Sequence, residues 1–210
     1  MKKIITISRE FGSGGRFIGE LVAKELGYKY YDKELIDLAA KESGLSAEFI
    51  EKSEQSLSSG WLYNLMLGSS YCSCNYTATP TAKVVPLADQ IFNAQRTTIL
   101  NLAKKEPCIL VGRCADYILR TSNEFDNNDI LNVFVYADED AKIKRAVENY
   151  KVPEADAAKI IMQINKRRAN HYNTFTEYTW GARENYDLLI NSAYAGIEKT
   201  AHIIADYAKE

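Results

Sequence analysis

Three closely spaced glycines near the start of the chain are the residues best suited to chemistry. They follow the apolar run 4–7 and precede a helical pattern that begins near Arg16. Glycine lets backbone N–H groups turn toward an anion without obstruction from a Cβ atom, and the N-terminus of the following helix adds partial positive charge. We therefore expect a phosphate group to be held by the loop residues Gly12, Ser13, Gly14, Gly15 and Arg16.

This loop departs from the phosphate-binding pattern G-x-x-x-x-G-K-[ST] at two informative positions. Arg9 stands where the first glycine would be, and Gly15 stands where the lysine would be. Arg16 is the nearest cation after the glycines, so we expect it to replace the lysine in part. Removing Arg16 should then slow phosphoryl transfer by about 10²-fold, which is typical of a lost electrostatic stabiliser.

A second interpretation of the same loop is a dinucleotide-binding turn. Gly12 and Gly14, with Asp32 further along the chain, match part of that pattern, in which an acid holds a ribose. Its third glycine lets the helix pack closely on the strand, but Phe17 stands at that position. The phenylalanine favours the phosphate-binding interpretation.

Four arginines are expected to reach the crevice that contains the loop. Arg113 follows the apolar run 108–111, and open α/β sheets bind ligands at the carboxyl ends of their strands. Arg145, Arg167 and Arg168 lie in two consecutive helical patterns, and the apolar stripe of the second pattern continues into the last two. Such guanidinium groups can neutralise a phosphoryl group in transfer. The alternative is a solvated basic helix end at Arg167 and Arg168.

Two aspartates are further candidates for substrate binding, and no residue is assigned as a direct metal ligand. Asp32 can accept a hydrogen bond from the acceptor or from a magnesium-bound water, although a helix N-cap is an equal alternative. Asp116 can contact substrate or magnesium, although it can also be an ordinary carboxylate in the first turn of a helix. We expect His171 to be a hydrogen-bonded interior or rim histidine rather than a catalytic base, and His202 to lie on the surface.

Short apolar runs alternate with helical patterns, which indicates an α/β fold of parallel strands joined by crossover helices. Helices are predicted to start at Pro86 and at Pro153, because proline suits the first helical turn. The predicted strands are the segments 4–8, 28–31, 108–111, 131–136 and 186–190.

The composition limits the class of protein. With 210 residues, 46% of them hydrophobic, the chain fits one globular domain with a full core. A formal net charge of −2 argues against general binding to nucleic acid. Neither a signal peptide nor a membrane span is apparent, so we expect a cytoplasmic protein. Four cysteines without C-x-x-C spacing are expected to be reduced thiols, namely Cys72, Cys74, Cys108 and Cys114.

The segment 55–82 contains no charged residue and has no clear period. It is predicted to be a long loop or a small lid-like insertion that covers substrate, with a poorly ordered surface excursion as the equal alternative. Its aromatic residues, which include Trp61, Tyr63, Tyr71 and Tyr76, suggest a possible homo-oligomer in which the insertion contacts a second copy.

Five short motifs together resemble the cytidylate kinase-like family, and they span nearly the whole chain. They are the residues 8–16, 31–34, 111–113, 166–169 and 186–188. The resemblance implies a P-loop NTPase-like three-layer α/β/α sandwich with a central five-stranded parallel sheet. It also implies a single domain over 1–210, with a helical NMP-binding insertion at about 46–85 and an arginine-bearing lid at about 145–180.

The resemblance also implies an activity, the transfer of the γ-phosphoryl group of ATP to CMP or dCMP with Mg²⁺. In that activity Arg113 would hold the phosphate of the acceptor. Cytidylate kinases carry a lysine where this chain has Gly15, and an acid is expected near His171. The alternative function is therefore a nucleotide-binding or phosphate-binding sensor, or an interaction module, that binds without transfer. The residues expected to stabilise the transferring group are Arg16, Arg145, Arg167 and Arg168.

Overall fold

The computed structural model describes residues 1–44, 46–48, 50 and 87–210. These residues form a five-stranded, all-parallel sheet in the order β2-β3-β1-β4-β5. The predicted α/β class and the central five-stranded sheet are confirmed. Dinucleotide-binding sheets typically have the order 3-2-1-4-5-6, so the second interpretation of the glycine loop loses its support. The strands are β1 (Ile4–Arg9), β2 (Lys29–Tyr31), β3 (Cys108–Val111), β4 (Ile130–Tyr136) and β5 (Leu188–Asn191).

The central strand is β1, which pairs with β3 on one side and with β4 on the other. Ile7 lies opposite Val111, the last residue of β3, and Arg9, the last residue of β1, lies opposite Val135 near the end of β4. The carboxyl ends of the three strands therefore lie at the same edge of the sheet. Successive side chains of a strand point to opposite faces, and Ile4 and Ile7 accordingly enter two different buried clusters. Because both faces are covered, the strand is buried from Ile4 to Ser8, including the polar side chains of Thr6 and Ser8.

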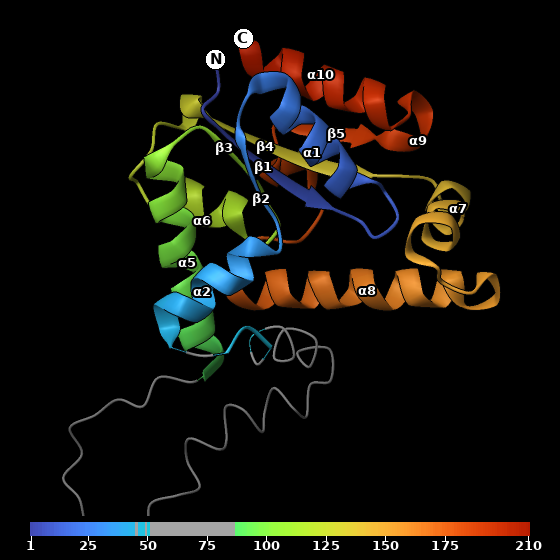
Figure 1. The fold of residues 1–210 in the computed structure, drawn as a ribbon, viewed down its shortest axis with the longest axis horizontal. Coiled ribbons are helices and arrows are strands. Elements are labelled where there is room, and N and C mark those ends of the chain that lie inside the picture. Colours follow the sequence, from blue (N-terminus) through green and yellow to red (C-terminus); the bar gives the residue numbers. More distant parts are fainter. Residues whose placement is uncertain (45, 49, 51–86) are drawn as a thin grey trace, which may run out of the picture.

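Helices α1 (Gly15–Leu26) and α10 (Ile197–Lys209) cover one face of the sheet (Figure 1). Helix α1 ends where Gly27 adopts a left-handed φ of 70°, as its position after the helical pattern predicts. The core on this face includes Ile5, Ile7, Ile18, Val22, Val133 and Ile204.

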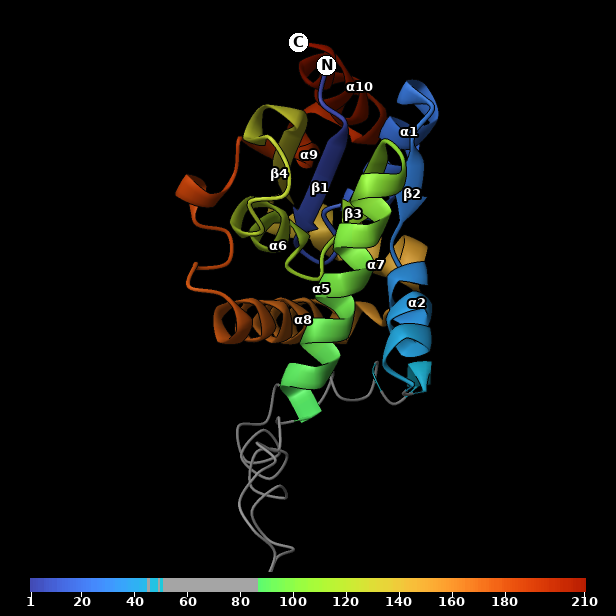
Figure 2. The same cartoon turned by 90° about the vertical axis from the view of Figure 1, so that its left-hand side faces the viewer.

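Helices α5 (Leu87–Lys105) and α6 (Ala115–Thr121) cover the opposite face (Figure 2). This second core also receives a side chain from α8 (Glu154–Phe175), namely Tyr172. The predicted three-layer α/β/α sandwich is therefore confirmed. The buried residues on this face include Ile4, Ile99, Leu110, Ile118 and Leu119.

The carboxyl ends of the strands point toward α8, which crosses the molecule beyond the edge of the sheet (Figures 1 and 2). Pro153 directly precedes α8, as predicted for the start of this helix. Helix α7 (Glu139–Tyr150) packs on α8, and α2 (Glu34–Ser43) packs on α5. The remaining described elements are α9 (Ser192–Ala195) and the 3-10 helices Asn127–Asp129 and Arg183–Asn185.

The last strand begins two residues later than its predicted start. Asp187 lies before β5 because it is bound to Asn132 of β4 through both backbone and side chain. The Asp187 amide donates to the Asn132 carbonyl (2.8 Å), and the Asn132 amide donates to Asp187 Oδ2 (2.7 Å). The carboxylate thus takes the place of a strand carbonyl at this position.

Several predictions lie outside the described residues. They include most of the insertion at 46–85, its homo-oligomer contact, and the two cysteines Cys72 and Cys74. Cys108 and Cys114 are buried and are not joined in a disulfide. In the part of the chain that the structure describes, no helix is both long and apolar enough to cross a membrane.

Candidate functional site

The glycine loop joins β1 to α1 in a conformation that requires glycine. Gly12 and Gly14 have φ values of 79° and 80°, in the left-handed region that residues with a Cβ atom rarely adopt. Gly15 begins α1, and the backbone of the loop is buried. The loop therefore brings a tight turn and a helix N-terminus to the carboxyl end of the central strand.

The outer side of the loop is held by Arg145 of α7. Its guanidinium donates hydrogen bonds to the carbonyls of Ser13 (3.0 Å) and Gly12 (3.4 Å), and also to the side chain and carbonyl of Ser192. The hydroxyl of Ser192 donates to the same Ser13 carbonyl. Arg145, which we predicted to face the transferring group, thus supports the loop from behind, and burial lowers its pKa.

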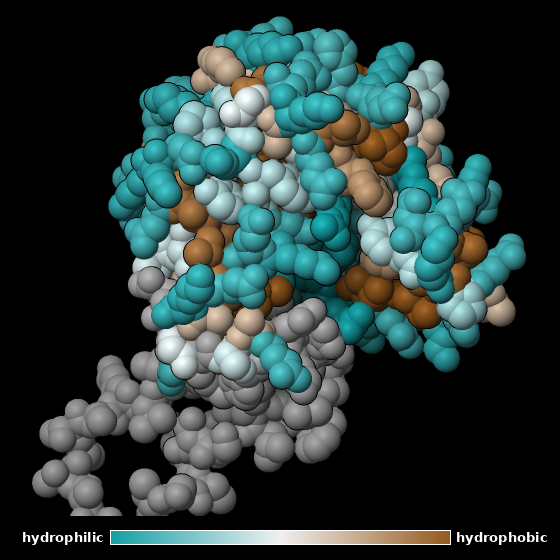
Figure 3. Space-filling model, in the orientation of Figure 1, coloured by the Kyte–Doolittle hydropathy of each residue, from teal (hydrophilic) through white to brown (hydrophobic). Residues whose placement is uncertain are grey.

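The inner side of the loop presents backbone donors. Among the described residues, the amides of Gly12, Gly14 and Gly15 have no hydrogen-bond partner, whereas the Phe11 amide donates to Asn165 Oδ1 of α8 (2.7 Å). These residues line a cavity of about 220 Å³, which we call the loop hollow. Figure 3 shows a hydrophilic hollow between the α1 and α2 side of the molecule and α7. Loop amides that have no partner in the described part of the chain, at the start of a helix, suit an anion.

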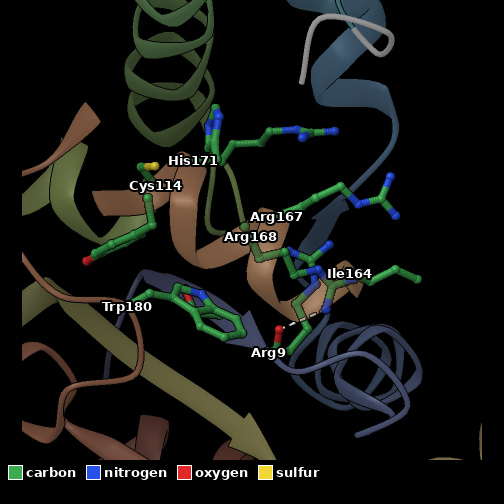
Figure 4. A pocket seen from close by; sticks show the side chains of 11 residues that line it. Arg9, Cys114, Ile164, Arg167, Arg168, His171 and Trp180 are labelled. Atoms are coloured by element: carbon green, nitrogen blue, oxygen red, sulfur yellow. Dashed lines mark hydrogen bonds between the residues drawn. The ribbon is translucent and has the colours of Figure 1, made fainter. Parts of the chain in front are cut away.

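A second cavity, of about 250 Å³, lies between the ends of β1 and β3 and helix α8. We call it the second hollow; Figure 4 shows its side chains. Three arginines line both cavities and therefore stand where they meet, namely Arg9, Arg113 and Arg168.

Arg9 belongs to this cluster, although its place in the sequence had suggested no role for it. Its guanidinium occupies the space beside Gly112, where an added Cβ would lie 2.0 Å from Arg9 Nη1. It forms an ion pair with Asp32 (3.3 Å), and burial lowers its pKa. The available signal was its replacement of the first P-loop glycine, which places a cation at the end of the central strand.

Arg168 is partly buried and contacts the same strand. Its Nη1 donates to the Arg9 carbonyl (2.9 Å; Figure 4), and its guanidinium lies 6.0 Å from the centre of the Phe11 ring. Burial, together with repulsion from Arg9 and Arg113, lowers its pKa to about 9. Three guanidinium groups this close together repel one another, and an anion bound between them would relieve that repulsion.

Arg16 and Arg167 lie at the margins of this cluster. Arg16 lines the loop hollow, but its side chain is 42% exposed and pairs with Glu20 (3.3 Å) and Asp32 (3.6 Å). Arg167 lines only the second hollow, together with Arg113 and Arg168. The structure thus brings three of the predicted arginines together around one cavity and places Arg145 behind the loop.

Asp32 lines the loop hollow and pairs with Arg9 and Arg16. No side-chain capping bond marks the start of α2, where Lys33 is the N-cap residue. The ion pairs therefore describe the Asp32 carboxylate better than the N-cap alternative does.

Asp116 lies behind the second hollow. It is 3% exposed in the first turn of α6, and its Oδ2 accepts a hydrogen bond from the Tyr172 hydroxyl (2.6 Å). Burial raises its pKa to about 6. Tyr172, rather than Asp116, reaches the cavity wall.

The two histidines differ in environment. His202 is exposed and contacts Glu25, as a surface residue does. His171 lines the second hollow, and neither ring nitrogen has a hydrogen-bond partner among the described residues. His171 therefore lies at an interior or rim position, as predicted, but the predicted hydrogen bond to its ring is not present among the described residues. Trp180 also lines this cavity; no feature of the sequence had indicated it.

Comparison with known proteins bears on this geometry. A sequence profile of the cytidylate kinase-like family matches residues 4–194. The chain belongs to this family. A comparison with curated protein sequences returns no significant match.

Solved structures show how widely the architecture of this family member is shared. An uncharacterized protein from Eubacterium ventriosum is 25% identical with a TM-score of 0.68, and the match covers 99% of this chain and 98% of the other. Shikimate kinase from Bacteroides thetaiotaomicron has 12% identity and a TM-score of 0.51, with 99% and 98% covered. Shikimate kinase from Acinetobacter baumannii, solved with shikimate, has 12% identity and a TM-score of 0.50, with 99% and 93% covered. The fold is thus that of P-loop kinases, and family membership supports a nucleotide kinase-like function.

Proposed function

We propose that this family member transfers the γ-phosphoryl group of ATP to a nucleoside monophosphate, with CMP and dCMP as the acceptors that its family suggests. One observation carries the proposal. Three partly buried arginines, Arg9, Arg113 and Arg168, stand where the loop hollow meets the second hollow. A donor polyphosphate on the loop and an acceptor phosphate in the second hollow would both face this cluster.

The reaction needs little acid-base assistance, because the acceptor phosphate is already an anionic nucleophile. One of its oxygens forms a bond to the γ-phosphorus as the bond from that phosphorus to the bridging oxygen breaks, and ADP leaves. The main obstacle is repulsion between two anions. Preorganised guanidiniums lower that barrier because they already point to where negative charge develops.

Each residue of the site then has a distinct role. The loop amides hold the donor phosphates, while Arg113 and Arg167 hold the acceptor phosphate. Arg9 and Arg168 stabilise the group in transfer. In this scheme Arg9, rather than Arg16, supplies the cation that the P-loop lysine would provide. Arg145 fixes the loop, Arg16 stands with Asp32 at the mouth, and Asp116 positions Tyr172.

The loop hollow fits ATP better than it fits a protein-bound metal ion. Its loop amides, which have no partner among the described residues, match phosphate oxygens. Its two carboxylates already face cations, because Glu10 pairs with Lys142 (2.9 Å) and Asp32 pairs with Arg9 and Arg16. Mg²⁺ commonly keeps several waters and uses substrate phosphates as ligands. We propose that Mg²⁺ enters with ATP and gains no direct carboxylate ligand from this loop.

A transfer assay tests the proposal. Radiolabelled ATP is incubated with the full chain and each common nucleoside monophosphate, and the labelled diphosphate is measured. Arg9→Ala should lower kcat by about 10²-fold or more. Arg183→Ala is the matched control, because Arg183 is exposed and pairs only with its neighbour Glu184 among the described residues. Transfer unaffected by Arg9→Ala would refute the role of the cluster.

A phosphate-binding sensor is the second candidate, and the absence of a loop lysine favours it. Such a protein needs the loop amides but not the arginines between the two hollows. It would gain thermal stability with ATP, because a ligand bound only to the folded state shifts the unfolding equilibrium. ATP binding without transfer to any acceptor would support the sensor over the kinase.

A further inference from the structure

We propose that His171 is a specificity residue, and that its imidazole hydrogen bonds to the uncharged, planar end of the acceptor. This inference rests on the proposed function, since it places the acceptor in the second hollow. The ligand class is a phosphorylated planar heterocycle that carries a hydrogen-bond donor and acceptor, as a nucleobase does.

The unpaired nitrogens of His171 are the first observation. Both ring nitrogens are buried without a partner among the described residues, and the ring lines the second hollow. A buried polar group without a partner is unfavourable, and native proteins contain few of them. A ligand that enters the hollow is the natural partner.

The imidazole is also held in place. Its ring contacts that of Phe175, with centroids 5.0 Å apart, and Phe175 stacks on Phe92 of α5 (4.8 Å, 7° between planes). This row of rings fixes the side chain against one wall. A residue whose orientation is set before binding can discriminate between ligands.

Charge determines what His171 can recognise. Burial and the nearby Arg113 lower its pKa to about 3, so the ring is neutral at physiological pH. A neutral imidazole has one donor nitrogen and one acceptor nitrogen. A carboxylate or phosphate offers only acceptors and cannot satisfy both. The anionic end of the ligand therefore belongs at the arginines, and an uncharged polar edge belongs at His171.

Trp180 is the reason that we expect the ligand to carry a planar ring. In Figure 4 Trp180 and His171 stand at opposite ends of the side chains that line the hollow, while Arg168 and its bond to the Arg9 carbonyl lie to one side. The indole is itself set by an edge contact with the Phe134 ring (5.3 Å, 77°). An indole wall suits a flat ring, since aromatic faces stack on nucleobases. The hollow thus combines a cationic end with a flat, hydrogen-bonding end.

Binding measured by calorimetry tests this inference without depending on catalysis. The full chain is titrated with CMP, UMP, AMP and GMP, and with ribose 5-phosphate, which has the phosphate but no base. At least one nucleotide should bind more tightly than ribose 5-phosphate. His171→Phe keeps a ring but removes both nitrogens, and it should weaken that nucleotide by about 10- to 100-fold while leaving ribose 5-phosphate nearly unchanged. His171→Gln, which retains a donor and an acceptor, should restore part of the loss.

The control is His202→Phe, because His202 is the other histidine of the chain and lies on the surface. Equal weakening of nucleotide and ribose 5-phosphate by His171→Phe would overturn the inference, as would no weakening at all. Failure of all four nucleotides to exceed ribose 5-phosphate would overturn it too. Nucleotide binding that depends on His171 without any phosphoryl transfer would defeat the proposed kinase activity but uphold the binding role.

Discussion

The two hollows share three arginines but surround them differently. In the loop hollow, Asp32, Lys33 and backbone amides accompany the guanidiniums, beside the side chains of Phe11, Ile36 and Tyr150. In the second hollow the same cations face His171 and Trp180, which are uncharged and partly apolar. The first cavity is suited to a polyanion of any identity, whereas the second is suited to a ligand that is anionic at one end only. Specificity in this molecule should therefore reside in the second hollow.

The largest expected effect comes from Arg168, one of the three arginines that both cavities share. Arg168→Ala should lower kcat by about 10²-fold or more. It should also weaken the binding of both ATP and the acceptor, because Arg168 borders both cavities. Arg167→Ala should weaken the binding of the acceptor but not that of ATP, because Arg167 borders the second hollow and not the loop hollow. Separate titrations of ATP and acceptor measure the difference. If both variants weakened only one ligand, the two cavities would not share a functional cluster.

The support of the loop should have the next largest effect. Arg145→Ala removes the charged donor from the carbonyls of Gly12 and Ser13 and should destabilise the fold by about 1–3 kcal/mol. Arg145→Ala should weaken the binding of ATP more than the binding of the acceptor, whereas Arg167→Ala should do the opposite. Urea unfolding and ATP titration report these effects. A variant with normal stability and normal ATP affinity would show that the loop does not need this arginine.

The pH dependence of stability distinguishes His171, which lines the second hollow, from Asp116, which lies behind it. Asp116 has a raised pKa, from 3.8 to about 6, so its stabilising contribution is complete below pH 3.8 and disappears as pH rises through 6. His171 has a lowered pKa, from 6.5 to about 3, so its contribution is complete above pH 6.5 and disappears as pH falls toward 3. Between pH 4 and 6 the two slopes oppose each other.

Single substitutions should expose each slope. Relative to the wild type, stability of Asp116→Asn should rise more steeply from pH 4 to 6, and stability of His171→Phe should fall more steeply. Denaturant unfolding at several pH values gives both slopes, and groups other than these two contribute equally to all three proteins. Parallel curves for the three proteins would contradict the assignment of buried, opposing titrations.

The smallest effect is expected at the mouth of the loop hollow. Arg16→Ala should change kcat by less than about 10-fold, because an exposed ion pair in water contributes only ~1 kcal/mol or less. This value is well below the 10²-fold that the loop pattern alone suggests. Steady-state kinetics of Arg16→Ala and Arg9→Ala, measured side by side, compares their kcat values. If Arg16→Ala were the more damaging of the two, Arg16 and not Arg9 would replace the lysine.

Much of the architecture follows from local patterns. The segment 108–111 was predicted as a strand with the bounds that β3 has, and Gly27 ends α1 where the helical pattern stops. Apolar periodicity and left-handed glycines depend on nearby residues, so a single sequence contains that information. The family motifs added the number of strands. The start of β5 was missed because a side chain distant in sequence replaces a strand carbonyl there.

The chemistry of the site depended on tertiary contacts instead. The sequence by itself determined that a glycine loop and several arginines lie near the carboxyl ends of parallel strands. Only the tertiary structure decided which arginine does what: Arg145 turns to the back of the loop, and Arg9 points into the space beside Gly112. The physical reason is that a guanidinium binds a carbonyl oxygen or a phosphate oxygen with similar geometry. Its partner is chosen by the packing of α7, α8 and β3 around it, which no local pattern records.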